Sequence, residues 1–411
     1  MIIHGTAYID GELKNTYIGI KKGKIDFVKK HYTGDEEVEE IDEVILPGGT
    51  DLHVHFRDPG HTKKEDFFSG SKSAAFGGIT TVADMPNNHP PIKTLDNFER
   101  KLEIAKEKSC VDFALYSLIG DDVEDIAERT GLFKIYLSSS TNTDKNVRVD
   151  GIRTVFEKGG KIAFHCEDEE YFSSPSEDLP GYNRFRPAES EVNAIRSLSE
   201  LPEGPKRVCH VSTKEGLEEA KSQDLTVEVT PHHLFLNEEA FLGGFGKVNP
   251  PLRKQDDQIA LWESYERGGI DFVASDHAPH LENEKSDFVD APPGIPGVET
   301  MYPLLLNSVS MGTISLSTVI ETIAEKPGEY LDVKKGKIKE GYYADFIMVD
   351  FRRIESIKRE NLHSKAGWSP FEGFNAVFPI HVMSRGEYLI KDNNFTGEKG
   401  RGKFISARSS I

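Results

Sequence analysis

The chain is poor in cysteine and in positive charge. It has three cysteines in 411 residues, at positions 110, 166 and 209, and no Cys-x-x-Cys pair. Three are too few for a disulfide framework, so a reducing cytoplasm is the expected location. Lys and Arg number 50 against 69 Asp and Glu, a net charge of −19. This balance argues against a nucleic-acid partner, because phosphate contacts need clustered basic side chains.

Long hydrophobic runs are also missing. No segment approaches the ~18 consecutive apolar residues of a membrane span, and the start of the chain has neither the basic nor the apolar region of a signal peptide. No Gly-x-Gly-x-x-Gly motif follows the first strand of the central region, and residues 243–248 lack the spacing and the Ser or Thr of a P-loop. With 37% hydrophobic and 29% charged residues, the composition is typical of a soluble globular protein without a membrane partner.

The two ends of the chain resemble each other and differ from the middle. Residues 2–45 read as short strands with turn signals at Asp10-Gly11 and Lys22-Gly23, and residues 336–411 look similar. Neither end is a convincing domain alone. We therefore predict one small β-sandwich domain formed from residues 1–48 and 336–411, around a central domain of residues 49–335.

The central region alternates strand-like and helix-like segments. Eight strand-like runs occur at residues 52–56, 80–85, 111–118, 132–137, 162–165, 207–211, 226–229 and 271–274. Helix-like stretches lie between most of them, and Ser212 followed by Glu215 has the spacing of a capping box. Eight such units favour an α/β fold of the (β/α)₈ TIM-barrel type, which typically needs ~250 residues. A doubly wound open sheet is the structural alternative.

Several predicted strands end in side chains that bind metals. His53 and His55 are two apart, so in a strand they point to one side and can share an ion; the alternative is a pair on an exposed strand. His165 and His210 end the fifth and sixth strands. Taken alone, each is more simply interpreted as a buried histidine of the core. Asp276 ends the eighth strand and can bind a metal while exchanging a proton, or can simply cap a helix.

Lys134 in the fourth strand is the least obvious candidate, because an ammonium group has no lone pair for a metal. A desolvated neutral lysine is nucleophilic and can take up CO₂ to form a carbamate, whose two oxygens can bridge two cations; a surface lysine is the alternative. Together with imidazole and carboxylate groups, such a ligand suits two Zn²⁺ ions that activate water and polarise a carbonyl. The predicted ligands are His53, His55, Lys134, His165, His210 and Asp276, and the implied reaction is hydrolysis of an amide-like bond.

These residues belong to a set of motifs with a known order. The motifs begin with His53-Val54-His55-Phe56-Arg57-Asp58-Pro59-Gly60 and continue at residues 78–82, 85–88, 134–136, 165–168, 186–189, 210–212, 230–234, 249–253, 276–280 and 364–371. In this respect the chain resembles the amidohydrolase superfamily and, within its cyclic amidohydrolase group, the dihydroorotases. The resemblance covers nearly the whole chain. It implies the barrel with a β-sandwich made from both termini, and two zinc ions bridged by a carbamylated Lys134.

The resemblance also implies the substrate and its contacts. Dihydroorotases interconvert N-carbamoyl-L-aspartate and L-dihydroorotate in pyrimidine synthesis, and they hold the ring carboxylate with residues that map to Arg57, Asn87 and His280. The planar fork of Arg57 fits a carboxylate, although a structural pair with Asp58 or a helix end is the alternative role. Asn249 maps to a contact with the ring amide. Asp276 is the expected catalytic acid and base, and residues 288–297 resemble a loop whose backbone meets the ring.

Two other functions stay open. A dihydropyrimidinase, hydantoinase or allantoinase would share the metal chemistry but has no ring carboxylate to bind, and such relatives usually lack an arginine at position 57. A non-catalytic scaffold for a pathway enzyme such as aspartate transcarbamoylase is the other alternative, although this chain keeps every ligand position. The candidate partners are therefore a small-molecule substrate and, among proteins, a second copy of the chain or aspartate transcarbamoylase.

Overall fold

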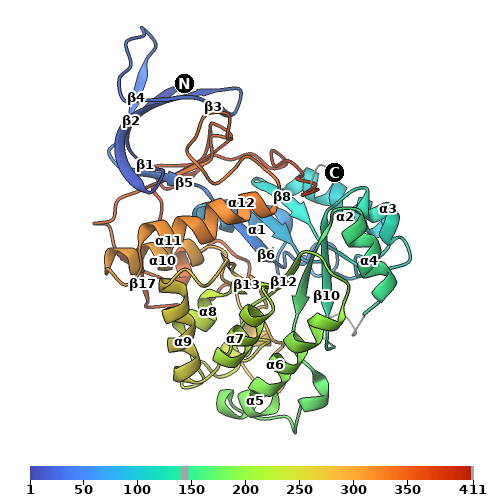
Figure 1. Cartoon of the computed structure of the whole chain (residues 1–411). Coiled ribbons are helices and arrows are strands. Elements are labelled where there is room, and N and C mark those ends of the chain that lie inside the picture. Colours follow the sequence, from blue (N-terminus) through green and yellow to red (C-terminus); the bar gives the residue numbers. More distant parts are fainter. Residues whose placement is uncertain (140–146, 409–411) are drawn as a thin grey trace.

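Both ends of the chain contribute to one nine-stranded sheet. The computed structural model describes residues 1–139 and 147–408. The strands of this sheet run in the order β20-β19-β18-β15-β5-β1-β2-β3, and β4 pairs with β1 (Figure 1). They are β1 (Ile2–Ile9), β2 (Glu12–Lys21), β3 (Lys24–Lys29), β4 (Val38–Glu40), β5 (Val44–Pro47), β15 (Phe346–Val349), β18 (His381–Ser384), β19 (Glu387–Lys391) and β20 (Asn394–Phe395). The antiparallel pairing of β15 with β5 joins the two ends.

The turns in this sheet follow from local sequence. Asp10-Gly11 connects β1 to β2, and Lys22-Gly23 connects β2 to β3. All four residues have positive φ, at 51°, 85°, 51° and 77°. Two successive left-handed residues match the right-handed twist of a hairpin, and a glycine in the second place has no Cβ to clash. The turn signals read from the sequence are therefore confirmed.

The centre of the chain forms a closed parallel barrel, as predicted. Its strands within the described residues are β6 (Gly49–Val54), β7 (Ile79–Asp84), β8 (Asp112–Leu115) continued by β9 (Ser117–Leu118), β10 (Leu132–Tyr136), β11 (Lys161–His165), β12 (Lys206–Val208), β13 (Thr226–Val229) and β14 (Phe272–Val273). Val54 makes a parallel bridge to His277 beyond β14, and the His55 backbone N–H donates to the His277 carbonyl at 2.8 Å. This contact joins the eighth strand to the first, so the open-sheet alternative is wrong.

Helices surround the barrel (Figure 1). The α-helices are α1 (Phe67–Phe76), α2 (Leu95–Lys108), α3 (Val123–Ala127), α4 (Val149–Glu157), α5 (Leu179–Phe185), α6 (Ala188–Ser197), α7 (Lys214–Ser222), α8 (Pro231–Phe235), α9 (Gln255–Glu266), α10 (Met301–Ser310), α11 (Leu316–Ile320) and α12 (Lys326–Tyr330). Short β16 (Glu355–Ser356) and β17 (Asn375–Ala376) pair with each other. None of the described helices is both long and apolar enough to cross a membrane.

The start of α7 differs from the expectation. Thr213, not Ser212, is the N-cap residue, and its side chain accepts from the Gly216 backbone N–H. The Ser212 hydroxyl instead donates to the buried carboxylate of Glu191 on α6. The capping-box spacing of Ser212 and Glu215 was therefore misleading, because a tertiary partner binds the serine.

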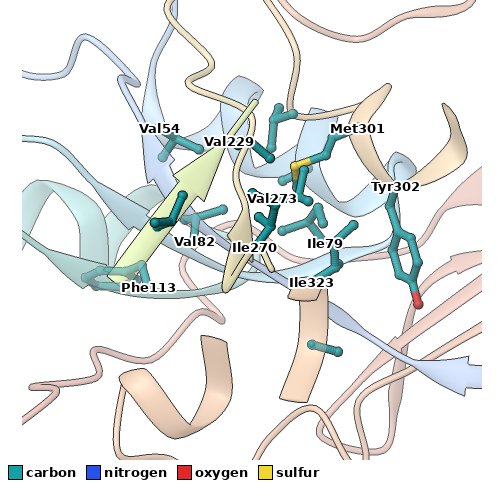
Figure 2. Close-up of a cluster of buried hydrophobic side chains, with 14 of the residues drawn as sticks. Val54, Ile79, Val82, Phe113, Val229, Ile270, Val273, Met301, Tyr302 and Ile323 are labelled. Carbon is teal, nitrogen blue, oxygen red and sulfur yellow. The ribbon is translucent and has the colours of Figure 1, made fainter. Parts of the chain in front are cut away.

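The largest apolar cluster lies between the barrel and its helices. Figure 2 shows Val54, Val82 and Phe113 of the first three strands on one side of this cluster and Met301 and Tyr302 of α10 on the other, and all five are fully buried. The end of the chain also packs on the barrel: Phe113 donates its backbone N–H to the Lys403 carbonyl at 3.0 Å, and Gly131 donates to Ser406 at 2.7 Å. The proposed domain boundaries, after residue 48 and before residue 336, stay predictions.

Candidate metal centre

A cavity opens at the carboxyl end of the barrel strands, where barrel enzymes carry their active sites. Its lining includes all six predicted metal ligands and three of the four predicted substrate contacts; the lining residues are His53, His55, Arg57, Asn87, Lys134, Tyr136, His165, His210, Val248, Asn249, Asp276, Ala278, Pro293 and Gly294. The fourth predicted contact, His280, lies just behind Arg57, with its Nε2 3.2 Å from Arg57 Nη2. The structure thus brings together residues spread over 228 positions of sequence, from 53 to 280.

The first group of donors is centred on Asp276. Its Oδ1 lies 3.3 Å from His53 Nε2 and 3.0 Å from His55 Nε2. The other ring nitrogens are held away from the cavity: His53 Nδ1 is 2.7 Å from Glu228 Oε1, and His55 Nδ1 is 2.6 Å from Asn87 Oδ1. A carboxylate or amide oxygen can only accept from Nδ1–H, which leaves each Nε2 lone pair toward Asp276 and an ion.

The second group of donors is the pair His165 and His210. His165 Nδ1 faces His210 Nε2 at 3.1 Å. On its far side, His165 Nε2 is 2.8 Å from Glu167 Oε2, and Arg186 in turn binds both oxygens of Glu167. Glu167 therefore orients His165, whereas Asp168 caps the short helix that follows.

Lys134 lies in the cavity floor and not on the surface. Its side chain is 1% exposed, and Nζ donates to the Cys209 thiol at 3.0 Å. No carboxylate lies within 4.0 Å of Nζ among the described residues. A buried amine beside a thiol, facing imidazoles, suits the predicted reaction with CO₂.

The electrostatics favour metal binding. Burial lowers the pKa of His53, His165 and His210, so these rings are neutral and keep a lone pair at neutral pH. Burial alone would raise the pKa of Asp276, but His53 and His55 lower it below its usual value overall. Ligating atoms of His53, His210 and Asp276 all lie within 4.8 Å of one another. Neutral imidazoles around an ionised carboxylate fit a divalent zinc-type ion.

Arg57 is a buried cation with an incomplete set of partners. It is 6% exposed, its Nε has no hydrogen-bond acceptor, and no carboxylate lies within the 4.0 Å of an ion pair in the part of the chain that the structure describes. Asp58 does not pair with it, because Asp58 Oδ2 is 2.7 Å from Lys108 Nζ. Burial of an unpaired charge is costly. A buried guanidinium that lies beside a cavity and has no carboxylate partner is a site for an anionic ligand.

The remaining predicted contacts are fixed by neighbours. The Tyr182 hydroxyl donates to Asn249 Oδ1 at 2.7 Å, and His233 supports the same loop from below, with Nε2 3.2 Å from the Pro250 carbonyl. Asn87 does more than face the cavity, since it also holds His55. His277, which follows Asp276, supports the site from outside the predicted ligand set, because its Nδ1 accepts from the Gly297 backbone N–H at 3.1 Å.

Three residues of the site have a strained backbone. Arg57, His210 and Asp276 have φ values of 60°, 39° and 45°. Non-glycine residues rarely adopt this left-handed region, and it persists where surrounding structure enforces it, often at functional sites. Here the strain turns three side chains at strand ends toward one cavity.

Glu228 is the most important residue that the sequence reasoning missed. It is fully buried in β13, accepts from His53 Nδ1, and lies 3.3 Å from Arg207 Nη1. Tyr136, which lines the cavity, was also missed. A charged residue inside the apolar run Thr226–Val229 was the available signal for Glu228, but its partner, 175 positions away, was not visible locally.

We expect Glu228→Gln to weaken metal binding by about 10–100-fold, because the neutral amide no longer stabilises the His53 N–H dipole or fixes its tautomer. Titration of metal-free protein with Zn²⁺ against a competing chelator measures this. Glu218→Gln, on the exposed face of α7, is the matched control and should bind as the unchanged protein does. Equal affinity in all three would show that Glu228 does not support the metal site.

The comparisons with known proteins agree with this geometry. The family model for the amidohydrolase family matches residues 44–172 and 198–389, so the chain belongs to the amidohydrolase family. Within that family, dihydroorotases are among the proteins that the chain is similar to over nearly its whole length. Those of Thermoplasma volcanium and Methanosarcina mazei are 41% and 37% identical to it, over 98% of this chain in both cases and 96% and 97% of the relatives.

Solved structures confirm the fold. An L-hydantoinase (dihydropyrimidinase) from Arthrobacter aurescens superimposes with a TM-score of 0.91 at 28% identity, covering 98% of this chain and 99% of that one. A D-hydantoinase superimposes with a TM-score of 0.90 at 25% identity, covering 99% and 98%. The predicted class of fold, a (β/α)₈ barrel with a β domain from both termini, is confirmed.

Proposed function

We propose that the chain is a zinc-dependent dihydroorotase that interconverts N-carbamoyl-L-aspartate and L-dihydroorotate in pyrimidine synthesis. The observation that carries the proposal is the buried, unpaired Arg57 in the same cavity as the metal donors. The metal donors account for amide hydrolysis, and Arg57 accounts for a substrate with a carboxylate. The relatives from Thermoplasma volcanium and Methanosarcina mazei, at 41% and 37% identity over nearly the whole chain, are dihydroorotases by name.

The metal site in this proposal has two zinc ions. His53, His55, His165, His210, Asp276 and a carbamate on Lys134 would hold these ions. When bound, the ions supply a hydroxide at neutral pH and polarise the carbonyl that it attacks.

The chain's own residues bind the ring and move the proton. Arg57, with Asn87 and His280 beside it, binds the ring carboxylate, and Asn249 contacts the ring amide. Asp276 takes the proton of the attacking water and delivers it to the ring nitrogen as the carbon–nitrogen bond breaks. Closure runs in reverse: Asp276 removes a proton from the ureido nitrogen, which attacks the carboxyl carbon, and the carbon–oxygen bond breaks as Asp276 returns the proton to the departing oxygen, which leaves as water. Opening creates a new carboxylate and releases a proton, so alkaline pH favours opening and mild acid favours closure.

The hydantoinase alternative has one supporting observation, the close superposition on hydantoinase structures. Hydantoin and dihydrouracil carry no carboxylate, however, so they would leave Arg57 buried without a partner. The scaffold alternative requires loss of metal ligands, and all six are present. We therefore keep dihydroorotase as the function.

The deciding experiment measures turnover of four substrates by zinc-loaded protein. L-Dihydroorotate, dihydrouracil, hydantoin and allantoin are compared at equal concentration, with N-carbamoyl-L-aspartate for the reverse reaction. Selective conversion of dihydroorotate in both directions is the expected result. Conversion of the uncharged rings alone would overturn the assignment in favour of a hydantoinase. No conversion by protein that contains zinc would favour the scaffold.

Lys134→Met provides a separate test of the metal site. We expect it to lower the bound zinc from two ions to one or none, because the bridging ligand is lost while the methionine fills the same space. Elemental analysis after desalting measures the zinc, and intact mass before and after acid treatment reports the CO₂ on Lys134. Lys161→Met on the next strand is the control. Two retained ions in Lys134→Met would refute the bridge.

Protein partners and location also belong to the proposal. A second copy of the chain or aspartate transcarbamoylase stays the predicted protein partner, and the cytoplasm stays the predicted location.

A further inference from the structure

His280 is surrounded by positive charge. Besides Arg57 Nη2 at 3.2 Å from its Nε2, Lys64 Nζ lies 3.0 Å from its Nδ1. Burial, Arg57, Lys64 and Lys285 all lower the pKa of His280, against a smaller opposite effect of the Pro293 carbonyl. The ring is therefore neutral and carries one proton, on Nδ1 or on Nε2.

The contacts of the ring decide which nitrogen carries it. Ammonium and guanidinium groups donate and cannot accept, so Lys64 favours an acceptor at Nδ1 and Arg57 favours one at Nε2. The Pro293 carbonyl oxygen, 3.1 Å from Nε2, can only accept and favours a proton on Nε2. The Nε2 proton satisfies the contacts with Lys64 and Pro293 and leaves Nε2–H and Arg57 Nη2 as two donors side by side. The opposite tautomer satisfies only the contact with Arg57, and it places two donors against each other at Nδ1 and two acceptors at Nε2.

Lys64 is itself held in place. Its Nζ lies 2.8 Å from Glu284 Oε1, and Glu284 Oε2 accepts from the Leu281 backbone N–H at 2.8 Å. Lys64 comes from the segment after β6, and Glu284 comes from the segment after β14. The pair therefore links the two loops that carry Arg57 and His280.

We propose that Lys64, held by Glu284, is a positioning residue that fixes His280 in the tautomer with a proton on Nε2. In the structure this proton is donated to the Pro293 carbonyl, and a substrate carboxylate beside Arg57 accepts it when bound. This rests on the proposed function only for the identity of the anion. The tautomer itself is a property of the protein. By fixing this tautomer, Lys64 determines specificity for anionic rings without contacting the reacting atoms.

The direct test is the nitrogen spectrum of His280. In zinc-loaded protein with ¹⁵N-labelled histidine, the His280 signals, assigned by their loss in His280→Gln, should show a pyrrole-type Nε2 and a pyridine-type Nδ1. In Lys64→Met the pattern should become mixed or reverse, because Nδ1 has lost its donor. Lys64→Arg keeps a group that only donates and should restore it. Lys63→Met, at the exposed neighbouring position, should leave it unchanged.

Kinetics supply the functional readout. Lys64→Met should raise KM for L-dihydroorotate about tenfold, the value of a hydrogen bond to a charged group, with little change in kcat. An acid limb should also appear in its pH profile, as the pKa of His280 rises when one of its three neighbouring cations is removed. Lys64→Arg should restore the KM, and Lys63→Met should not alter it.

The outcomes separate the two proposals. An unchanged His280 spectrum in Lys64→Met overturns the positioning role, whatever the enzyme turns over. A changed spectrum with an unchanged KM overturns the role in substrate binding. If the unchanged protein fails to convert dihydroorotate although its His280 carries the Nε2 proton, the proposed function fails and the tautomer assignment stands.

Discussion

Asp276→Asn is expected to lower kcat by about 10³–10⁴-fold in both directions of the reaction. The asparagine keeps an oxygen near His53 and His55 but cannot accept a proton from water or return one to nitrogen, and positioned proton transfer contributes up to about this factor. Initial rates of opening and closure, measured with saturating zinc, check the effect. Equal losses in the two directions are required, because one residue serves both.

Two controls isolate the proton transfer. Zinc content of Asp276→Asn must be measured alongside, since loss of the ion would produce the same fall in rate for another reason. Asp26→Asn changes an exposed aspartate of β3 in the β domain and should keep full activity. A variant that retains zinc and retains activity within tenfold would remove Asp276 from the acid–base role.

Arg57→Met is expected to change activity and stability in opposite directions. The ratio kcat/KM for L-dihydroorotate should fall by about 10²–10³-fold, mostly through KM, because the lost interaction holds the carboxylate in the ground state and the transition state alike. Conversion of uncharged rings should not fall. The free energy of unfolding without substrate should rise by about 1–4 kcal/mol, because a buried charge without an anionic partner is replaced by an apolar side chain.

Arg186→Met is the matched control for stability. Arg186 is also a buried arginine, but it binds both oxygens of Glu167, at 2.9 and 2.6 Å. Its removal leaves a buried carboxylate unpaired, so the free energy of unfolding should fall by about 3–5 kcal/mol. Denaturant unfolding of the two variants under the same conditions makes the comparison. If Arg57→Met were destabilised to the same extent, Arg57 would have a structural role and the carboxylate site would lose its main support.

Local patterns were enough to locate the candidate donors. His53 and His55 are two residues apart in a strand, and His165, His210 and Asp276 each follow an apolar run, so their positions could be read without tertiary information. The barrel itself followed from the regular alternation of strands and helices. The turn at Asp10-Gly11 was equally readable, because its conformation depends on two adjacent residues.

Local patterns did not predict the role of a side chain whose partner is distant in the sequence. Ser212 had the sequence of a helix cap, but Glu191, 21 positions earlier, binds its hydroxyl. Glu228 looked like part of a strand until the fold placed it against His53. Nothing in the local sequence singled out Lys64, and only the approach of the segment after β14 gave it His280 and Glu284 as partners.

The sequence by itself determined the barrel, the sheet shared by both termini and the chemical types of the metal donors, because these depend on spacings of a few residues repeated along the chain. Tertiary structure decided which ring nitrogen faces the cavity, which arginine lacks a carboxylate and which lysine contacts His280. Those choices depend on pairs such as His55 and Asp276, 221 positions apart. Only closure of the barrel brings such residues within hydrogen-bonding distance.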